Sequence, residues 1–390
     1  MEPSSFQNPL RRRLELPVET AAPLSLHHRL PDYARTPLCD APELAGQLGV
    51  AHVLVKDEAS RLGLPAFKML GASWACYRGL IDRLGANPDV GEPWVDVAEL
   101  AKRFVPLQPL TLATATDGNH GRALARFARM LGFAARVWVP ASTVQTRIAA
   151  IEGEGAMVTV VDGGYDDAVQ AAAGAADDRT LVISDTSWPG YEVVPQWVID
   201  GYATVFHEID VQLQDQAEPA PDVIMVPVGV GALAAAVVTH YRRPGHPAPV
   251  LVGVEPVDAA CVQASVRAGK IVTLAGEQRS IMAGLNCGTP SKVAWPLVSG
   301  GIDWFVAVDD DQARAAMRRL AAVGIVSGES GAASLAGAVQ LRRDTGTQVL
   351  RGDATVLLLS TEGATDPVAY EEIVGRPPEA VRAVTAGDTW

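Results

Sequence analysis

Short apolar runs alternate with stretches of helical periodicity along nearly the whole chain. Val53 to Lys56 reads as a strand, and the apolar stripe that follows it steps by 4, 3, 4 and 3 residues and stops at Gly85. That spacing predicts one amphipathic helix, because it repeats once per helical turn, and a glycine often ends a helix. Its apolar positions are Leu70, Trp74, Tyr77, Ile81 and Leu84.

The same alternation continues to the end of the chain. The strand-like run TLATAT leads through a tight turn into a helical stripe closed by Gly132, and further strand-like runs are ARVWVP, DVIMVPV, PVLVGVEP, WFVAV and ATVLLLS. Strands alternating with helices are typical of parallel α/β layers. We therefore expect an α/β protein of two domains, each with a mostly parallel open sheet flanked by helices, with the active site in the cleft between them. Ligands of such sheets bind at the carboxyl ends of the strands.

Composition and charge exclude some classes of binding partner. The 390 residues carry a formal net charge of −13 and no basic cluster beyond Arg11 to Arg13, which argues against nucleic acid and anionic membranes and favours a small-molecule partner. The longest apolar candidate, 223–238, is interrupted by proline and glycine, and the N-terminal stretch lacks a signal-type apolar segment. We therefore expect no transmembrane helix and a cytoplasmic location.

Cysteine and histidine spacing indicates no metal site. The four cysteines form no CxxC pair, and the seven histidines are scattered along the chain without ligand spacing. Closely spaced Cys and His ligands are typical of zinc sites. We therefore expect no metal.

Lys68 stands at the start of the first predicted helix, in LPAFKMLGASWA. A lysine is unfavourable at the positive end of a helix dipole, and an amine that loses hydration there can attack a carbonyl to form a Schiff base. The alternative is a solvated lysine whose stem lies along the helix.

The glycine-rich stretch VGVGA follows the strand-like run DVIMVPV. Glycines at this point let backbone amides approach an anion at a helix N-terminus, so a phosphate is the natural guest. Two alternatives remain. The glycines can serve tight strand–helix packing, or they can belong to a dinucleotide fingerprint, with Gly229, Gly231 and Ala234 in G-x-G-x-x-A and Glu255 as the ribose-binding acid.

Carboxylates and hydroxyls follow other strands. Asp117 in TDGNHG and Asp185 in SDTSWPGY are candidate acids or bases, although either can simply initiate a turn. Glu329 needs no function at a helix start, whereas Ser360 or Thr361 can face a ring nitrogen or cap a turn. Together, an amine, a phosphate cradle, carboxylates and a hydroxyl fit pyridoxal 5′-phosphate.

These motifs also carry a family resemblance. In order along the chain, from about residue 36 to 375, they are TPL, VKDEASRLGLPAFKMLGA, TATDGNHGRALA, DTSWPGYEVVPQWVIDGYAT, GVGA, SIMAGLNCGTPS, SGESGA and LLSTEG. The set resembles the diaminopropionate ammonia-lyases, which are fold type II pyridoxal-phosphate enzymes of the tryptophan-synthase β-like class. TDGNHG, DT.W.GY and IMAGL.CG distinguish this branch from serine and threonine dehydratases.

The resemblance implies roles for individual residues. Lys68 would hold the cofactor as a Schiff base, Asn119 would contact its 3′-oxygen, and Ser360 would face the ring nitrogen, with Thr361 as a nearby alternative. Asp117 and Asp185 would be two bases, one for each substrate enantiomer. The phosphate would be bound by Gly229, Val230, Gly231 and Ala232, and the substrate carboxylate by Thr116, Asp117, Gly118, Asn119 and His120.

It also implies a fold and a reaction. The smaller domain would span 62–187 and the larger 1–61 and 188–390, and the enzyme would be a homodimer that converts 2,3-diaminopropionate to pyruvate and two ammonia. The chain is shorter than expected before Gly324, which leaves the exact substrate open. Cys261 and Cys287 match a neighbouring pair near the site entrance in some relatives, with a disulfide undecided. The alternatives are a serine/threonine dehydratase-like eliminase, an NAD-dependent oxidoreductase and a non-catalytic amino-acid-binding homologue.

Overall fold

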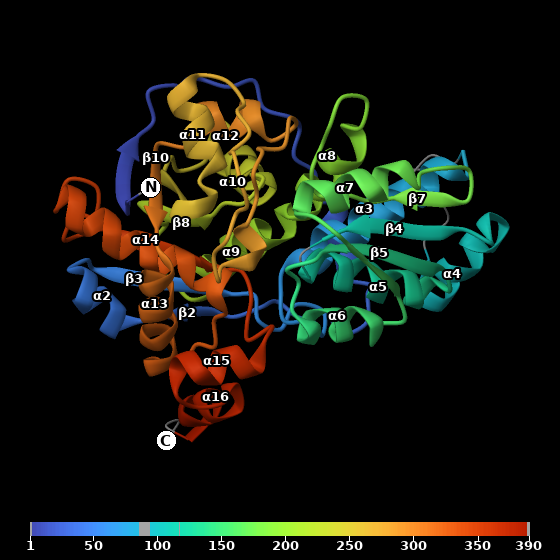
Figure 1. Ribbon diagram of the computed structural model, residues 1–390. Helices are drawn as coiled ribbons and strands as arrows, with labels where there is room; N and C mark the ends of the chain where they lie inside the picture. Colours follow the sequence, from blue (N-terminus) through green and yellow to red (C-terminus); the bar gives the residue numbers. More distant parts are fainter. Residues whose placement is uncertain (1, 86–93, 117, 388–390) are drawn as a thin grey trace.

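Two separate β-sheets organise the protein in a computed structural model, which describes residues 2–85, 94–116 and 118–387. Within these ranges one sheet has seven strands and the other four (Figure 1). Parallel pairing dominates both sheets. The expectation of an α/β protein with mostly parallel sheets is confirmed, whereas the domain boundaries at 62 and 187 stay a prediction.

The larger sheet has parallel inner strands and an antiparallel strand at each edge. Its inner strands are buried along nearly their whole length, which explains their continuous apolar runs. The short edge strands were not recognised from the sequence, because they lack a long apolar run. In spatial order the strands are β1 (Ser4–Gln7), β10 (Trp304–Val308), β9 (Val250–Pro256), β8 (Val223–Pro227), β11 (Thr355–Ser360), β3 (His52–Asp57) and β2 (Leu38–Asp40).

The smaller sheet is entirely parallel. Parallel neighbours place their carboxyl ends at one edge, so the loops that follow β4 and β7 come together. In spatial order its strands are β6 (Met157–Val161), β5 (Ala134–Pro140), β4 (Thr111–Ala115) and β7 (Thr180–Val182).

Helices pack against the faces of both sheets and form apolar cores with them. One apolar cluster joins Leu54 of β3 with Leu112 of β4, so it links the two sheets, and a second cluster packs beneath the other face of the larger sheet. The helices are α1 (Ala22–His27), α2 (Pro42–Leu48), α3 (Lys68–Arg83), α4 (Val97–Phe104), α5 (Asn119–Leu131), α6 (Gln145–Glu152), α7 (Tyr165–Gly174), α8 (Val193–Gly201), α9 (Ala203–Asp215), α10 (Ala232–Tyr241), α11 (Cys261–Ala268), α12 (Trp295–Gly301), α13 (Asp310–Ala322), α14 (Glu329–Thr345), α15 (Pro367–Val374) and α16 (Pro378–Gly387).

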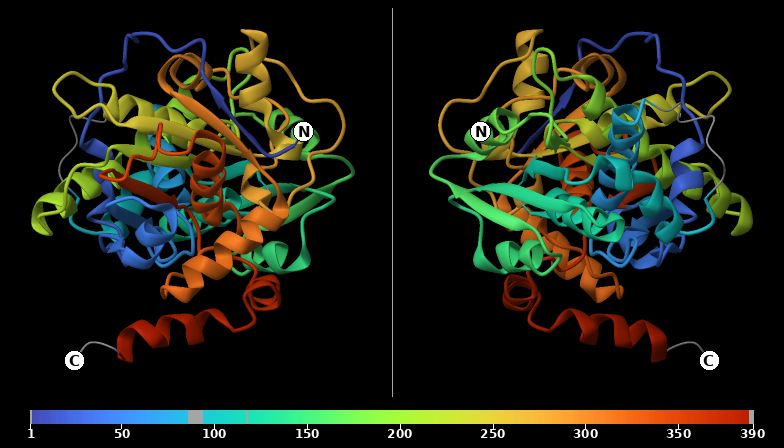
Figure 2. Two further views of the ribbon diagram at one scale, coloured as in Figure 1. Left: turned by 90° about the vertical axis from the view of Figure 1, so that its left-hand side faces the viewer. Right: turned by 90° about the vertical axis from the view of Figure 1, so that its right-hand side faces the viewer.

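Several of these helices bear on the sequence predictions. The predicted stripe forms α3, which buries Leu70 and Trp74. The C-terminal helices α15 and α16, red in Figure 2, lie at one end of the molecule in both views. No helix in the described ranges has the length and apolar character needed to cross a bilayer.

A buried ion network fastens α9 to the segment that leads into the site. Glu208 of α9 lies within 2.8 Å of Lys56 Nζ and within 2.6 Å of Arg61 Nη1, and all three side chains are buried. Burial alone would raise the pKa of Glu208, but Arg61 and Lys56 hold it at about 2.

Glu208→Gln is expected to cost about 3–5 kcal/mol of unfolding free energy, because it leaves buried Lys56 without its ion-pair partner and removes one of the two carboxylates that pair with Arg61. Urea denaturation measures the change. Asp215→Asn on the same helix removes an exposed ion pair with Arg35 and should change stability by less than about 1 kcal/mol. A Glu208→Gln loss no larger than that of Asp215→Asn would contradict the assignment. Since folding lowers the pKa of Glu208, its contribution is present above the unfolded value of 4.5 and is lost as pH falls through about 2.

Candidate active site

A pocket opens where strands of both sheets end. It contains about 650 Å³ of empty space, its mouth included. Its walls come from the starts of α3 and α5, the loop after β7, the β8–α10 turn and the loop after β11, and they comprise Phe67, Lys68, Asn119, Tyr165, Asp185, Pro227, residues 229–233, Gly284, Leu285, Cys287, Ser330, Thr361 and Glu362. The expected cleft between the two sheets is therefore present.

Lys68 faces a carboxylate across this pocket. Its Nζ lies 2.6 Å from Asp185 Oδ2, and the two side chains are 17% and 8% exposed. Tyr165 donates a hydrogen bond to Asp185 Oδ1 at 3.0 Å. The picture of a solvated lysine along the helix surface is wrong, because this amine is sheltered and ion-paired.

The charge state of Asp185 follows from these contacts. Burial alone would raise the pKa of Asp185, but the charges of Lys68 and His120 and the hydrogen bonds from Lys68 and Tyr165 hold it well below its usual range. Asp185 is therefore a carboxylate at neutral pH, as a base requires. Asp117, the second predicted base, lies outside the described residues.

The glycine stretch forms the turn between β8 and α10. Gly231 has φ +98° and is the residue before α10, a conformation that favours glycine. A Cβ at Gly229 would lie 3.1 Å from Cys287 Sγ and 3.2 Å from the Gly284 carbonyl oxygen, so a side chain there would require these neighbours to move apart slightly. The first amides of α10 have no partner within the helix and suit a phosphate.

Glu255 excludes the dinucleotide alternative. The carboxylate is fully buried and accepts hydrogen bonds from the backbone amides of Val262 and Gln263, each at 2.8 Å. Both oxygens are thus committed to the start of α11. No ribose reaches a carboxylate held in this way.

Among the described residues of the TDGNHG turn, Asn119 lines the pocket wall. Thr116 accepts a hydrogen bond from the Gly118 amide at 3.0 Å, and the buried His120 donates from Nε2 to the Ile183 carbonyl oxygen at 2.8 Å. Burial lowers the pKa of His120 and favours its neutral form. Thr116, Gly118 and His120 therefore shape the turn behind Asn119.

The two hydroxyl candidates differ in position. Ser360 is fully buried and donates to Ser327 Oγ at 2.8 Å, whereas Thr361 lines the pocket.

Cys261 donates to the Gly229 carbonyl oxygen at 3.8 Å, and Cys287 also lines the pocket; both are thiols in this structure. The two cysteines therefore meet at the glycine turn, as the resemblance suggested.

Sequence reasoning missed Tyr165 and Glu362. Glu362 is buried and accepts hydrogen bonds from Asn119 Nδ2 and from the Ser330 amide. Its place directly after Thr361 was a signal that could have identified it. Tyr165 opens α7 just after the carboxyl end of β6, but β6 was not predicted from the sequence, so the residue that follows it was missed. Burial and the charge of Glu362 raise the pKa of the neighbouring Glu329 to about 7.

Comparison with known proteins places this geometry in a family. The family model for pyridoxal-phosphate dependent enzymes matches residues 30–362. Diaminopropionate ammonia-lyase of Salmonella typhimurium is 35% identical over 368 residues, covering 90% of each chain. The chain belongs to the diaminopropionate ammonia-lyase family of pyridoxal-phosphate-dependent enzymes.

Two further matches show how much of the chain resembles the ammonia-lyases and how much resembles the dehydratases. The crystal structure of the Escherichia coli ammonia-lyase in complex with D-serine superimposes with a TM-score of 0.86 at 33% identity, covering 96% of this chain and 97% of that one. L-threonine dehydratase of Mycobacterium leprae is 32% identical but covers only 66% of this chain and 58% of its own. The ammonia-lyase likeness therefore spans the whole architecture, whereas the dehydratase likeness is partial.

The pocket fits the cofactor of this family. It offers one amine, on Lys68, and a glycine turn that leaves backbone rather than side chains at the wall. It also offers the hydroxyl of Thr361. The amine suits the aldehyde of the cofactor, the glycine turn suits its phosphate, and the hydroxyl suits its pyridine nitrogen. The predicted cofactor, pyridoxal 5′-phosphate, is confirmed by the family match.

Proposed function

We infer that the protein catalyses the pyridoxal-phosphate-dependent α,β-elimination of 2,3-diaminopropionate to pyruvate and two ammonia. The observation that carries this inference is the 2.6 Å contact between Lys68 Nζ and Asp185 Oδ2 beside the glycine turn, in a chain whose likeness to the ammonia-lyases spans 90% of both sequences.

The binding roles are assigned as follows. Lys68 Nζ would hold the cofactor aldehyde, Asn119 would contact the 3′-oxygen, and Thr361 or Ser360 would face the ring nitrogen. The amides of Gly229, Val230, Gly231 and Ala232 would bind the phosphate. When bound, the cofactor supplies a pyridine ring that withdraws electrons from the substrate Cα.

The protein itself supplies the proton transfers. Asp185 removes the Cα proton of one enantiomer through Oδ2, since Oδ1 is held by Tyr165. Asp117 is assigned the other enantiomer. Once the substrate amine has replaced Lys68 on the cofactor, the freed Lys68 amine, which is within hydrogen-bond distance of Asp185, would take up a proton and pass it to the departing β-amine. The turn of Thr116, Gly118, Asn119 and His120, with Asp117, orients the substrate carboxylate.

A dehydratase-like elimination is the second candidate, because the threonine dehydratases share the family and part of the sequence. The connection between α13 and α14 supplies a place where the substrate range can differ. It runs over 323–328, next to Ser330 on the pocket wall. The NAD alternative fails at Glu255, and a purely binding role is disfavoured by membership in a family of enzymes.

Substrate preference tests the assignment directly. With pyridoxal phosphate supplied, kcat/KM is measured for D- and L-2,3-diaminopropionate, serine and threonine. We expect diaminopropionate to exceed both hydroxy amino acids by about 10²-fold or more, because a site built for an ammonium leaving group discriminates through charged contacts. A higher kcat/KM for serine or threonine would move the protein to the dehydratases.

Tyr165→Phe is expected to lower kcat about 10- to 100-fold for the enantiomer served by Asp185, because it removes one hydrogen bond to a charged group, worth about 1.5–3 kcal/mol. Steady-state rates on both enantiomers measure it. Tyr370→Phe is the control, since Tyr370 is buried and its hydroxyl has no hydrogen-bond partner in the described part of the chain. Equal losses in the two variants would contradict a role for Tyr165 at Asp185.

Assembly, location and domain limits stay proposals. We expect a cytoplasmic homodimer, with domains 62–187 and 1–61 plus 188–390. Light scattering of the purified protein gives its mass and tests the dimer.

A further inference from the structure

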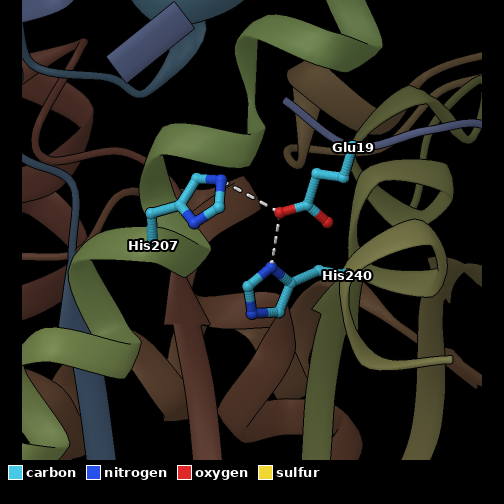
Figure 3. A group of neighbouring side chains, drawn as sticks. All are labelled: Glu19, His207 and His240. Atoms are coloured by element: carbon cyan, nitrogen blue, oxygen red, sulfur yellow. Dashed lines mark hydrogen bonds and ion pairs between the residues drawn. The ribbon is translucent and has the colours of Figure 1, made fainter. Parts of the chain in front are cut away.

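The N-terminal segment reaches a cluster of histidines away from the pocket. Residues 8–20 form neither helix nor strand. They are fixed to α12 by hydrogen bonds from Asn8 to the Ser299 carbonyl oxygen and from the Arg12 amide to the Gly300 carbonyl oxygen. Further along, the Glu19 side chain turns inward and is only 7% exposed. Figure 3 shows it between His207 and His240.

These three side chains form a compact donor set. Glu19 Oε1 lies 3.0 Å from His207 Nε2 and 3.0 Å from His240 Nδ1, and one donor atom from each residue lies within 4.8 Å of the others. Two imidazoles and one carboxylate are a ligand set that zinc uses at sites with one open position. The His240 side chain is 0% exposed and that of His207 is 21% exposed, but the Nε2 atom of His207 is itself buried, so the donor atoms lie inside the protein.

Neighbouring charges orient the donors. Asp210 Oδ2 lies 3.1 Å from His240 Nε2. His240 Nδ1 donates a hydrogen bond to Glu19 Oε1 at 3.0 Å in this structure. A bound metal ion would replace that proton, and Asp210 would accept the N–H that remains on the distal nitrogen, as is typical of metal-bound histidine. Arg243 Nη1 lies 2.9 Å from Glu19 Oε1, so it holds one carboxylate oxygen from outside.

Direct contacts leave this cluster unsatisfied. In the described part of the chain, His207 Nε2 makes no directed hydrogen bond despite its 3.0 Å distance from Glu19, and Glu19 Oε2 has no hydrogen-bond partner at all. Both atoms are buried. Buried polar atoms are rarely left without a partner, and a bound metal ion would supply one to both atoms.

We propose that Glu19, His207 and His240 bind a divalent transition-metal ion of the zinc class, which fastens the N-terminal segment to α9 and α10. None of the three lines the active-site pocket. α10 begins at the glycine turn and carries His240 near its other end. The ion is therefore structural, and it stabilises the helix whose first residue contributes to the pocket wall.

The test uses the full chain with its cofactor bound. Protein stripped with a chelator is dialysed against Zn²⁺, and bound metal is counted by mass spectrometry. Co²⁺ titration then reports ligand type through its visible absorption. We expect one ion per chain, a Co²⁺ spectrum of tetrahedral nitrogen and oxygen ligands, and a higher melting temperature in the metal-bound protein. A wild-type chain that binds no Zn²⁺ would show a charge network without metal and overturn the proposal.

Variants locate the ion. His207→Ala removes a partly exposed ligand and should abolish binding while cofactor absorbance is retained. His52→Ala, a 44% exposed histidine outside the cluster, should bind as wild type does. His246→Ala should also bind, although Asp210, His240 and His246 form a second donor group. Binding lost in His246→Ala and kept in His207→Ala would overturn the assignment to Glu19, His207 and His240.

Discussion

Lys68→Ala is expected to lose turnover by a factor of about 10³ or more, because no other lysine of the described residues lines the pocket and Lys68 serves in both cofactor binding and proton transfer. The visible absorbance of the bound cofactor should disappear with it. Absorbance spectra and pyruvate release on the same preparation measure the two effects together.

Lys102→Ala is the matched control for this change. Lys102 is an exposed residue of α4, so its removal should leave both spectrum and rate as in wild type. Unchanged absorbance in Lys68→Ala would contradict the assignment of this lysine.

Asp185→Asn is expected to lower kcat by about 10²- to 10⁴-fold with one enantiomer of diaminopropionate and much less with the other. The amide keeps the shape of the side chain but cannot accept the Cα proton. Rates on the separate enantiomers, with cofactor absorbance as the check on binding, measure the difference.

Asp200→Asn provides the comparison for this variant. Asp200 lies on α8 and pairs with Gln196 outside the active-site pocket, so it tests the loss of a carboxylate without a catalytic role. Equal losses on both enantiomers in Asp185→Asn would refute separate bases, and Asp117 would then need another role.

The periodic pattern predicted the parts of the fold that depend on long apolar runs. The stripe from Leu70 to Leu84 became α3, and the five-residue burial of β8 matches its unbroken apolar run. The edge strands β1 and β2 have three or four residues each. β1 pairs with β10, which is distant in sequence, and β2 pairs with β3 across the helix α2, so the short runs themselves gave no pattern that predicted them.

Some residues of the site could likewise be predicted from the sequence, and others could not. Lys68, Asp185 and the glycine turn each follow a strand or open a helix, which is why loop chemistry identified them before any geometry was known. Tyr165 opens α7 just after β6, a strand that the sequence analysis did not predict, and Glu19 lies in a segment without helix or strand. Tyr165 acts through Asp185, twenty residues further along, and Glu19 meets two histidines more than a hundred residues away. Only tertiary packing creates those contacts.

The central claim is that this pocket eliminates the β-amine of 2,3-diaminopropionate. The most direct test is the ratio of ammonia to pyruvate released from that substrate by the purified protein with pyridoxal phosphate. The account predicts two ammonia for each pyruvate, with loss of both products in Lys68→Ala. Absence of pyruvate from both enantiomers, in protein whose cofactor absorbance shows a loaded site, would contradict it.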